Sequence, residues 1–279
     1  VNGEVTGGPV YYIKAAFKGI FGKALSTLFA VFIILALGFM GNMVQSNSIG
    51  AAFVEAFQVF HVELSPAIVG IVVAVIAAVI FLGGTKSLAT VVEKIVPIMA
   101  GIYIIGSLVV ILLNINSIPT AFMQIIVGAF KPNAVLGGAA GITVREAIRY
   151  GVARGLFSNE AGMGSTPHAH AVARVKHPCD QGLVAMMGVF IDTLIILNLT
   201  AFAVMITGQL NTYNQDLTGA ALTQAAFTAD FGKFGAIFIA ICMFFFAFST
   251  IIGWYFFGEK NVRYLFSKHA NLATKIYAA

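Results

Sequence analysis

Long apolar runs alternate with short polar segments along this chain. Five runs are long enough to cross about 30 Å of hydrocarbon, which takes about 20 residues of helix. These runs are Ala24–Val44, Pro66–Gly83, Val91–Leu113, Leu183–Thr207 and Phe234–Phe257. The pattern therefore predicts an all-α bundle of membrane-spanning helices.

Basic residues gather at one end of the predicted spans, as they do in cytoplasmic loops. The loops Gln45–Ser65, Asn114–Asn116 and Leu210–Asp230 contain no Lys or Arg, which places them outside. Residues 1–23 are expected in the cytoplasm, because they carry lysines just before the first span. The basic residues that set this orientation are Lys14, Lys18, Lys23, Lys86, Lys94, Arg174, Lys176, Lys260, Arg263 and Lys268.

This alternation requires a sixth crossing, from Ala147 to about Val172, which hydropathy alone would miss. The crossing contains GLFSNEAGMGS, residues 155–165, where glycines weaken a helix and Ser158, Asn159 and Glu160 carry polar groups. Non-helical backbone at membrane depth survives only where it is buried in protein or lines a watery cavity. We therefore expect a broken helix whose freed carbonyls and amides bind a small substrate or ion. The alternative is a glycine-rich packing face between helices.

Two shorter amphipathic segments, Ile118–Phe130 and Leu217–Thr228, are expected to be interfacial or re-entrant helices on the outer side. Three arginines run against the charge rule, because they lie on the outer half of the sixth crossing. They form either a solvated rim or part of a gate, and they are Arg145, Arg149 and Arg154.

Further polar residues interrupt the apolar runs. Asn42 and Gln45, in GNMVQSNS, share a helix face at the predicted outer end of the first span, where they either meet a ligand or are solvated. Asp192, with Thr193 beside it, lies about ten residues into a span and needs a cation, a donor network or a proton.

Two adjacent hydroxyls, those of Ser249 and Thr250, lie in the middle of the last span. Oxygen ligands suit a hard cation such as sodium. Hydrogen bonding back to the preceding turn is the usual alternative for such residues.

The composition supports a bilayer environment. Of 279 residues, 59% are hydrophobic and 10% are charged, whereas soluble domains carry roughly 25% charged residues. The net charge of +5 is scattered near the ends of apolar runs, so no nucleic-acid partner is expected. Two cysteines and the pair His168 and His170 lack the spacing of a metal site, and no nucleophile–base pair marks an enzyme.

Together these motifs resemble a known family. GLFSNEAGMGS followed by PHAHA resembles the signature of the alanine/glycine:cation symporters, also called sodium:alanine symporters. Further motifs of the family occur in the family's order across nearly the whole chain: GGPVYYI, GNMVQSNS, FIDTLI and FAFSTIIGWYFFGE. The family more often has alanine where His170 stands.

The resemblance implies a leucine-transporter-type fold of two inverted five-helix repeats, in which the six crossings correspond to helices 3 to 8. It also implies a single transmembrane fragment that lacks the first two and the last helices. The function implied is symport of alanine or glycine with sodium, possibly with protons, across the cell (inner) membrane, with Na⁺ as coupling ion and no cofactor. A truncated, non-transporting membrane protein of the same fold is the alternative.

Laid onto this sequence, the resemblance assigns two sets of residues. The substrate-binding set is Asn42, Gln45, Phe157, Ser158, Asn159, Glu160, Ala161 and Gly162. The sodium-binding set is Phe246, Ser249, Thr250, Asp192 and Thr193.

Overall fold

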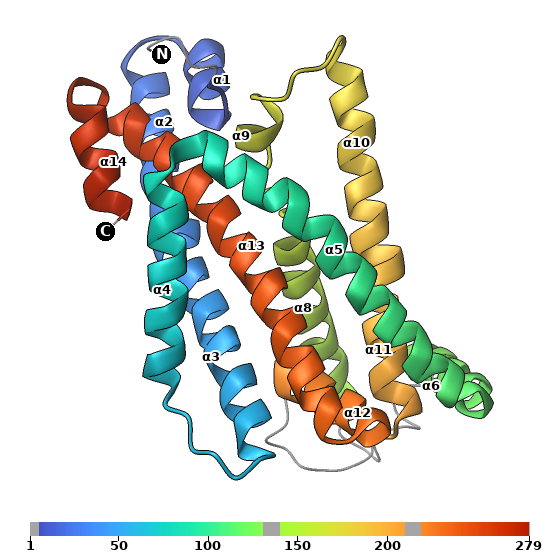
Figure 1. The fold of residues 1–279 in the computed structure, drawn as a ribbon. Helices are drawn as coiled ribbons and strands as arrows, with labels where there is room; N and C mark the ends of the chain where they lie inside the picture. Colours follow the sequence, from blue (N-terminus) through green and yellow to red (C-terminus); the bar gives the residue numbers. More distant parts are fainter. Residues whose placement is uncertain (1–5, 131–139, 210–218, 279) are drawn as a thin grey trace.

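The computed structural model describes residues 6–130, 140–209 and 219–278 (Figure 1). Within these ranges every regular element is a helix, which confirms the all-α prediction. Four stretches are long and apolar enough to cross a membrane: Gly19–Gln58, Ser87–Leu113, Pro178–Ile206 and Lys233–Leu265.

The elements follow one another along the chain as short and long helices. They are α1 (Pro9–Ala16), α2 (Gly19–Ile33), the π-helix η1 (Ile34–Gly41), α3 (Asn42–Gln58), α4 (Pro66–Leu82), α5 (Gly84–Leu113), η2 (Ile115–Ser117), α6 (Ile118–Phe130), α8 (Ala140–Ser158), α9 (Pro167–His170), α10 (Pro178–Phe190), the π-helix η3 (Ile191–Ile196), α11 (Leu197–Ile206), α12 (Ala220–Phe231), α13 (Lys233–Leu265), η4 (Ser267–His269) and α14 (Ala270–Ala278).

Several predicted boundaries agree closely with these helices. Helix α6 has the bounds predicted for the first amphipathic segment, and α12 covers most of the second, whose first residues, 217 and 218, lie outside the described ranges. The predicted span at Pro66 is α4, whose 17 residues rise about 25 Å. That is shorter than the four long stretches. The crossing through α8 is long enough but polar, so the crossings through α4 and α8 remain predictions.

The first helix is longer than predicted. We placed its end at Val44, whereas α2, η1 and α3 form one stretch of 40 residues that ends at Gln58. Asn42 and Gln45 therefore lie inside a helix and not at its outer end. The polar segment stays helical because Asn42 and Gln45 share a helix face with Ile49 and Ala52, which are buried in the packed interior.

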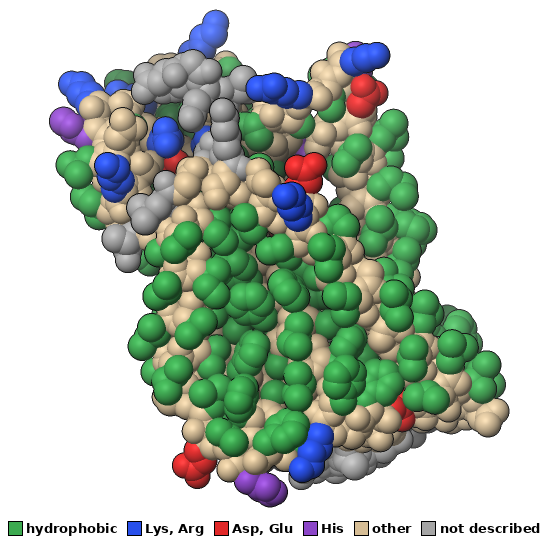
Figure 2. Space-filling view, in the orientation of Figure 1, with side chains coloured by type: hydrophobic (Ala, Val, Ile, Leu, Met, Phe, Trp, Pro, Cys, Tyr) green, Lys and Arg blue, Asp and Glu red, His purple; other side chains and the backbone are tan. Residues whose placement is uncertain are grey.

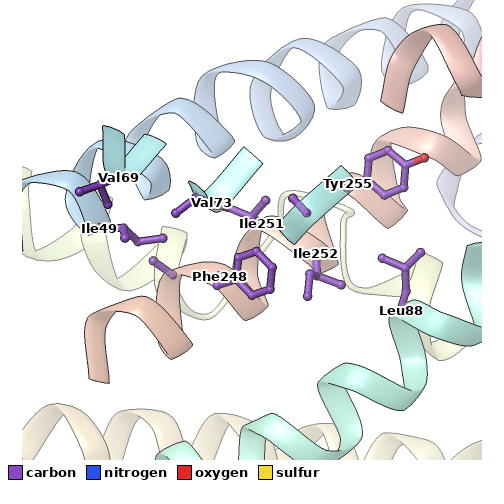
Figure 3. Close-up of a cluster of buried hydrophobic side chains, with 10 residues drawn as sticks. Ile49, Val69, Val73, Leu88, Phe248, Ile251, Ile252 and Tyr255 are labelled. Atoms are coloured by element: carbon purple, nitrogen blue, oxygen red, sulfur yellow. The ribbon is translucent and has the colours of Figure 1, made fainter. Parts of the chain in front are cut away.

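Helix α13 crosses the centre of the bundle and carries most of the core (Figure 1). Its side chains Phe248, Ile251 and Ile252 pack against Ile49 of α3 and Val73 of α4 (Figure 3). Nearer the C-terminal end of α3, four alanines let α3 and α13 approach closely, as small residues do between membrane helices. They are Ala52, Ala56, Ala236 and Ala240.

The surface has the pattern of a membrane protein. Figure 2 shows a wide band of hydrophobic side chains over the middle of the bundle, with charged side chains near its two ends. Large apolar residues of α4 and α5, such as Ile71, Val79 and Ile105, are more than half exposed. Such a surface matches lipid and not water. Several apolar helices of membrane-spanning length make this a multi-pass membrane protein.

Candidate substrate and ion site

The glycine-rich segment does break a helix, as predicted. Helix α8 ends at Ser158, and the next regular element is the short α9. The end is a Schellman motif: the Ala161 amide donates to the Leu156 carbonyl at 2.9 Å, and the Glu160 amide donates to the Phe157 carbonyl at 3.2 Å. Glu160 adopts φ +50°, the left-handed conformation that glycine usually supplies at this position.

This capping turn corrects one part of the prediction. We expected free backbone amides from Ser158 to Gly162, but the amides of Asn159, Glu160 and Ala161 are bonded back to α8. These amides are not free, because they donate to the last carbonyls of α8, which have no other partner within the helix. In this stretch of the described chain, the Gly162 amide donates to no acceptor.

The carboxylate of Glu160 ties the segment after the break to α13. Its Oε1 accepts a hydrogen bond from the indole Nε1 of Trp254 at 2.7 Å. Its Oε2 accepts from the hydroxyls of Ser165 at 2.7 Å and Thr166 at 3.2 Å. Both oxygens are therefore engaged within the protein.

Trp254 is a site residue that sequence reasoning missed. Its ring lies 5.2 Å from that of Phe157 in an edge-to-face arrangement, and the indole is 4% exposed. A Cβ at Gly41 would come within 2.5 Å of the same ring. The available signal was chemical: a tryptophan N–H inside a membrane helix needs an acceptor.

A second polar network joins the break to η3. The Ser158 hydroxyl donates to Asp192 Oδ2 at 2.8 Å, and the Thr193 hydroxyl donates to Asn159 Oδ1 at 3.0 Å. Asp192 and Thr193 lie within the π-helix, which shifts the helix register there; such segments occur frequently at functional sites. The structure thus brings four predicted residues together, two from each predicted set.

Asn42 and Gln45 lie just beyond the other π-helix, η1. Asn42 Nδ2 donates to the Gly38 carbonyl at 3.2 Å, while its Oδ1 is buried and accepts no hydrogen bond within the described chain. Gly41, which abuts Trp254, directly precedes Asn42. Asn42, the first of the two predicted residues on α3, therefore directly follows a residue that abuts the Trp254 ring.

The hydroxyls of Ser249 and Thr250 both donate to the Phe246 carbonyl, each at 2.9 Å. Two predicted sodium-binding residues thus donate to the carbonyl oxygen of a third. The same bonds are the ordinary back-bonding of hydroxyl side chains in a helix. No hydrogen bond in the described ranges links this group to Asp192. Phe246 also lines a mostly apolar cavity of about 190 Å³ with Tyr103 and Thr200.

His168 is fully packed, with 1% exposure, and no cluster of potential metal ligands occurs around it or elsewhere in the described ranges. Its Nδ1 lies 2.8 Å from the Ser165 carbonyl, which can only accept, so Nδ1 carries the proton. Its Nε2 then accepts from the amide nitrogen of Asn261 in α13 at 2.8 Å. His168 is thus a second link from the break to α13.

These features define a class of protein: a multi-pass helical membrane protein with a broken helix and a polar centre. Comparison with known proteins is more specific. A model of the sodium:alanine symporter family matches residues 1–279. The chain belongs to that family.

Among named relatives, the chain is similar to the sodium/alanine symporter AgcS of Methanococcus maripaludis, with 42% identity over 95% of this chain and 56% of the relative. It is also similar to the amino-acid carrier protein AlsT of Bacillus subtilis, with 41% identity over 94% of this chain and 53% of the relative. An uncharacterized transporter of Haemophilus influenzae is 43% identical over 95% of this chain and 56% of the relative. The chain spans about half the length of the curated relatives it matches.

Proposed function

We propose that the full-length protein couples the inward movement of Na⁺ to the uptake of alanine or glycine across the cell membrane, with residues 1–23 in the cytoplasm. Family membership supports a transporter, and the relative AgcS is named a sodium/alanine symporter. The proposal includes the leucine-transporter-type inverted repeat, in which α8 is the first half of a broken helix.

The observation that carries the proposal is the network at the α8 break. Asp192 lies near the middle of the 29-residue stretch Pro178–Ile206. A carboxylate at that depth is costly unless a positive charge or a donor network compensates it. The hydrogen bond from Ser158 is the compensation recorded in the described structure. A hard cation would complete it.

For sodium, the proposal uses two groups of oxygens. The first contains the Asp192 carboxylate, the Thr193 hydroxyl and the Asn159 side-chain oxygen, which lie beside the C-terminal, negative end of the α8 dipole. The second contains the Phe246 carbonyl and the hydroxyls of Ser249 and Thr250.

For the amino acid, we place the pocket between the end of α8 and the start of α3. The Gly162 amide is the donor for the substrate carboxylate, and the Asn42 side-chain oxygen is an acceptor for its ammonium group. Ser158 lines the pocket while its hydroxyl donates to Asp192. Phe157 narrows the space so that small side chains fit best. Gln45, Asn159, Glu160 and Ala161 complete the lining.

Coupling follows if ion and substrate each stabilise the same conformation. Ser158 and Asn159 belong to both proposed sites, so ordering one site orders the other. Shared residues of this kind favour binding of the two ligands together.

The test is uptake by the purified full-length protein in liposomes. We expect labelled alanine or glycine to accumulate against its gradient when external Na⁺ exceeds internal Na⁺. A sodium ionophore should abolish that accumulation. The proposal is rejected if neither a sodium nor a proton gradient drives uptake of either amino acid.

A further inference from the structure

Glu160 occupies a position where its backbone is strained. At φ +50° a non-glycine residue costs about 1 kcal/mol relative to the right-handed region. Glycine is available two residues later, at Gly162, and would end the helix without that cost. A strained residue that persists points to a requirement for its side chain.

The side chain of Glu160 makes three hydrogen bonds, and one of them reaches another helix. The contact with Trp254 Nε1 joins residues 94 positions apart, from the break to α13. The contacts from Ser165 and Thr166 come from the segment leading into α9. One carboxylate therefore fixes the loop and the indole relative to each other.

The indole in turn contacts residues of the two elements between which we place the pocket. Trp254 contacts Phe157, the penultimate residue of α8, and also abuts Gly41, directly before Asn42. If the indole turned away, Phe157 would lose its edge-to-face partner and the pocket would widen. Such aromatic contacts contribute about 0.5–1.5 kcal/mol beyond area burial.

We propose that Glu160 is a positioning residue for substrate specificity: it anchors the Trp254 indole, which sets the size of the pocket, and does not bind the substrate ammonium group. This inference rests on the proposed function for its pocket, but not for the anchoring contact. It replaces a direct ligand role for Glu160 with an indirect one.

Two conservative variants distinguish positioning of the indole from direct binding of the ammonium group, because one changes the charge of the side chain and the other changes its length. Glu160→Gln removes the charge but keeps an oxygen at the same reach for the indole. Glu160→Asp keeps the charge but withdraws it by one methylene, about 1.5 Å. Positioning therefore predicts that E160Q retains a KM for alanine within about threefold of wild type. It predicts that E160D raises that KM about tenfold, roughly 1.4 kcal/mol, and loses discrimination against leucine.

Direct binding of the ammonium group predicts the opposite ranking, with E160D milder than E160Q. That ranking, or an unchanged alanine-to-leucine ratio in E160D, would overturn the proposal. Glu63→Gln is the matched control, because Glu63 is exposed in the loop between α3 and α4. A role in folding alone would lower Vmax and protein yield without changing the substrate ratio.

Coupling between the two partners gives a second readout. Trp254→Phe removes the indole N–H, so Glu160→Asp should then add little. Effects of the two changes that multiply, instead of overlapping, would contradict a shared role.

A measurement without transport keeps this inference separate from the proposed function. In full-length protein labelled with 5-fluorotryptophan, the ¹⁹F resonance lost in Trp254→Phe belongs to Trp254. That resonance should shift in E160D more than in E160Q; an unchanged resonance in E160D overturns the anchoring. If wild-type protein shows no uptake while the resonance shifts, the proposed function fails and the anchoring stands.

Discussion

Helices α13 and α8 both contribute to the candidate site, but they are held in very different ways. Half of the apolar stretch of α13 is buried, and it packs against helices from α2 to α14. On α8, every residue from 148 to 158 is exposed except Gly155, which is half-buried. The site therefore joins a firmly packed helix to one that this chain holds mainly through polar contacts at its end.

The contrast assigns separate tasks to packing and to hydrogen bonds. Packing fixes α13, so Trp254 and Asn261 are fixed reference points for the site. The polar links from Glu160 and His168 then position the break against them. Polar links exchange partners at lower cost than a packed interface, so the break is where we expect movement during transport.

We expect the largest effect from removing the charge of Asp192, which lies beside the end of α8. Asp192→Asn should weaken the apparent affinity for sodium roughly 100-fold, because two charges 4 Å apart interact by about 4 kcal/mol at an effective dielectric of 20 before desolvation is counted. Sodium dependence of alanine uptake by the full-length protein measures this. Glu93→Gln, exposed on α5, is the control. An unchanged sodium dependence would remove Asp192 from the ion site.

Cutting the link between the break and α13 should have the next largest effect. His168→Leu keeps much of the volume but loses two hydrogen bonds, each contributing about 1 kcal/mol. We expect uptake to fall about tenfold and the midpoint of thermal unfolding to drop. His269→Leu, at an exposed position before α14, should change neither. Wild-type uptake in His168→Leu would show that the break needs no such link.

The hydroxyls on α13 test whether the packed helix has its own ion site. Thr250→Val should raise the sodium concentration needed for half-maximal uptake about fivefold, or roughly 1 kcal/mol, with little effect at saturating sodium. Thr207→Val is the matched control, because Thr207, the C-cap residue of α11, back-bonds to the Ala203 carbonyl in the same way. If both variants behave alike, the Thr250 hydroxyl only bonds its own helix.

We expect the smallest effects from adding a methyl group to a glycine packed against α13 and to a glycine on the exposed α8. Gly41→Ala places a methyl group within 2.5 Å of the Trp254 ring and should lower the unfolding temperature by several degrees. Gly151→Ala on α8 meets nothing within 4 Å. It should stabilise the helix by about 0.5–1 kcal/mol through helix propensity. Thermal unfolding of the full-length protein in detergent measures both, and similar shifts would refute the contrast.

Much of the fold was predictable because hydropathy reports the solvent of each segment. The bounds of α6 and the position of α4 came directly from apolar runs and prolines. The end of the first helix did not, because a polar stretch inside a helix and a polar loop have the same hydropathy. Its small residues, such as Ala52, indicate helix packing only once α13 is known to lie opposite.

The site was predictable as a set of residues but not as contacts. The glycines correctly located the break, whereas the rule that glycine ends a helix favours Gly162 over Glu160. The pairing of Ser158 with Asp192 spans 34 positions and depends on how α8 meets η3. Trp254 was passed over because a single tryptophan in an apolar run resembles ordinary lipid-facing or core packing.

The π-helix η1 carries a consequence for how this sequence tolerates length changes. Each residue of an α-helix turns the chain by about 100°, and a π-turn holds one residue more than an α-turn. Deleting one residue between Ile34 and Gly41 is therefore expected to restore plain α-helix, while the residues after it keep the directions they face. Deleting one residue from the plain α-helix α2 would instead turn Asn42 and Ile49 together by about that angle.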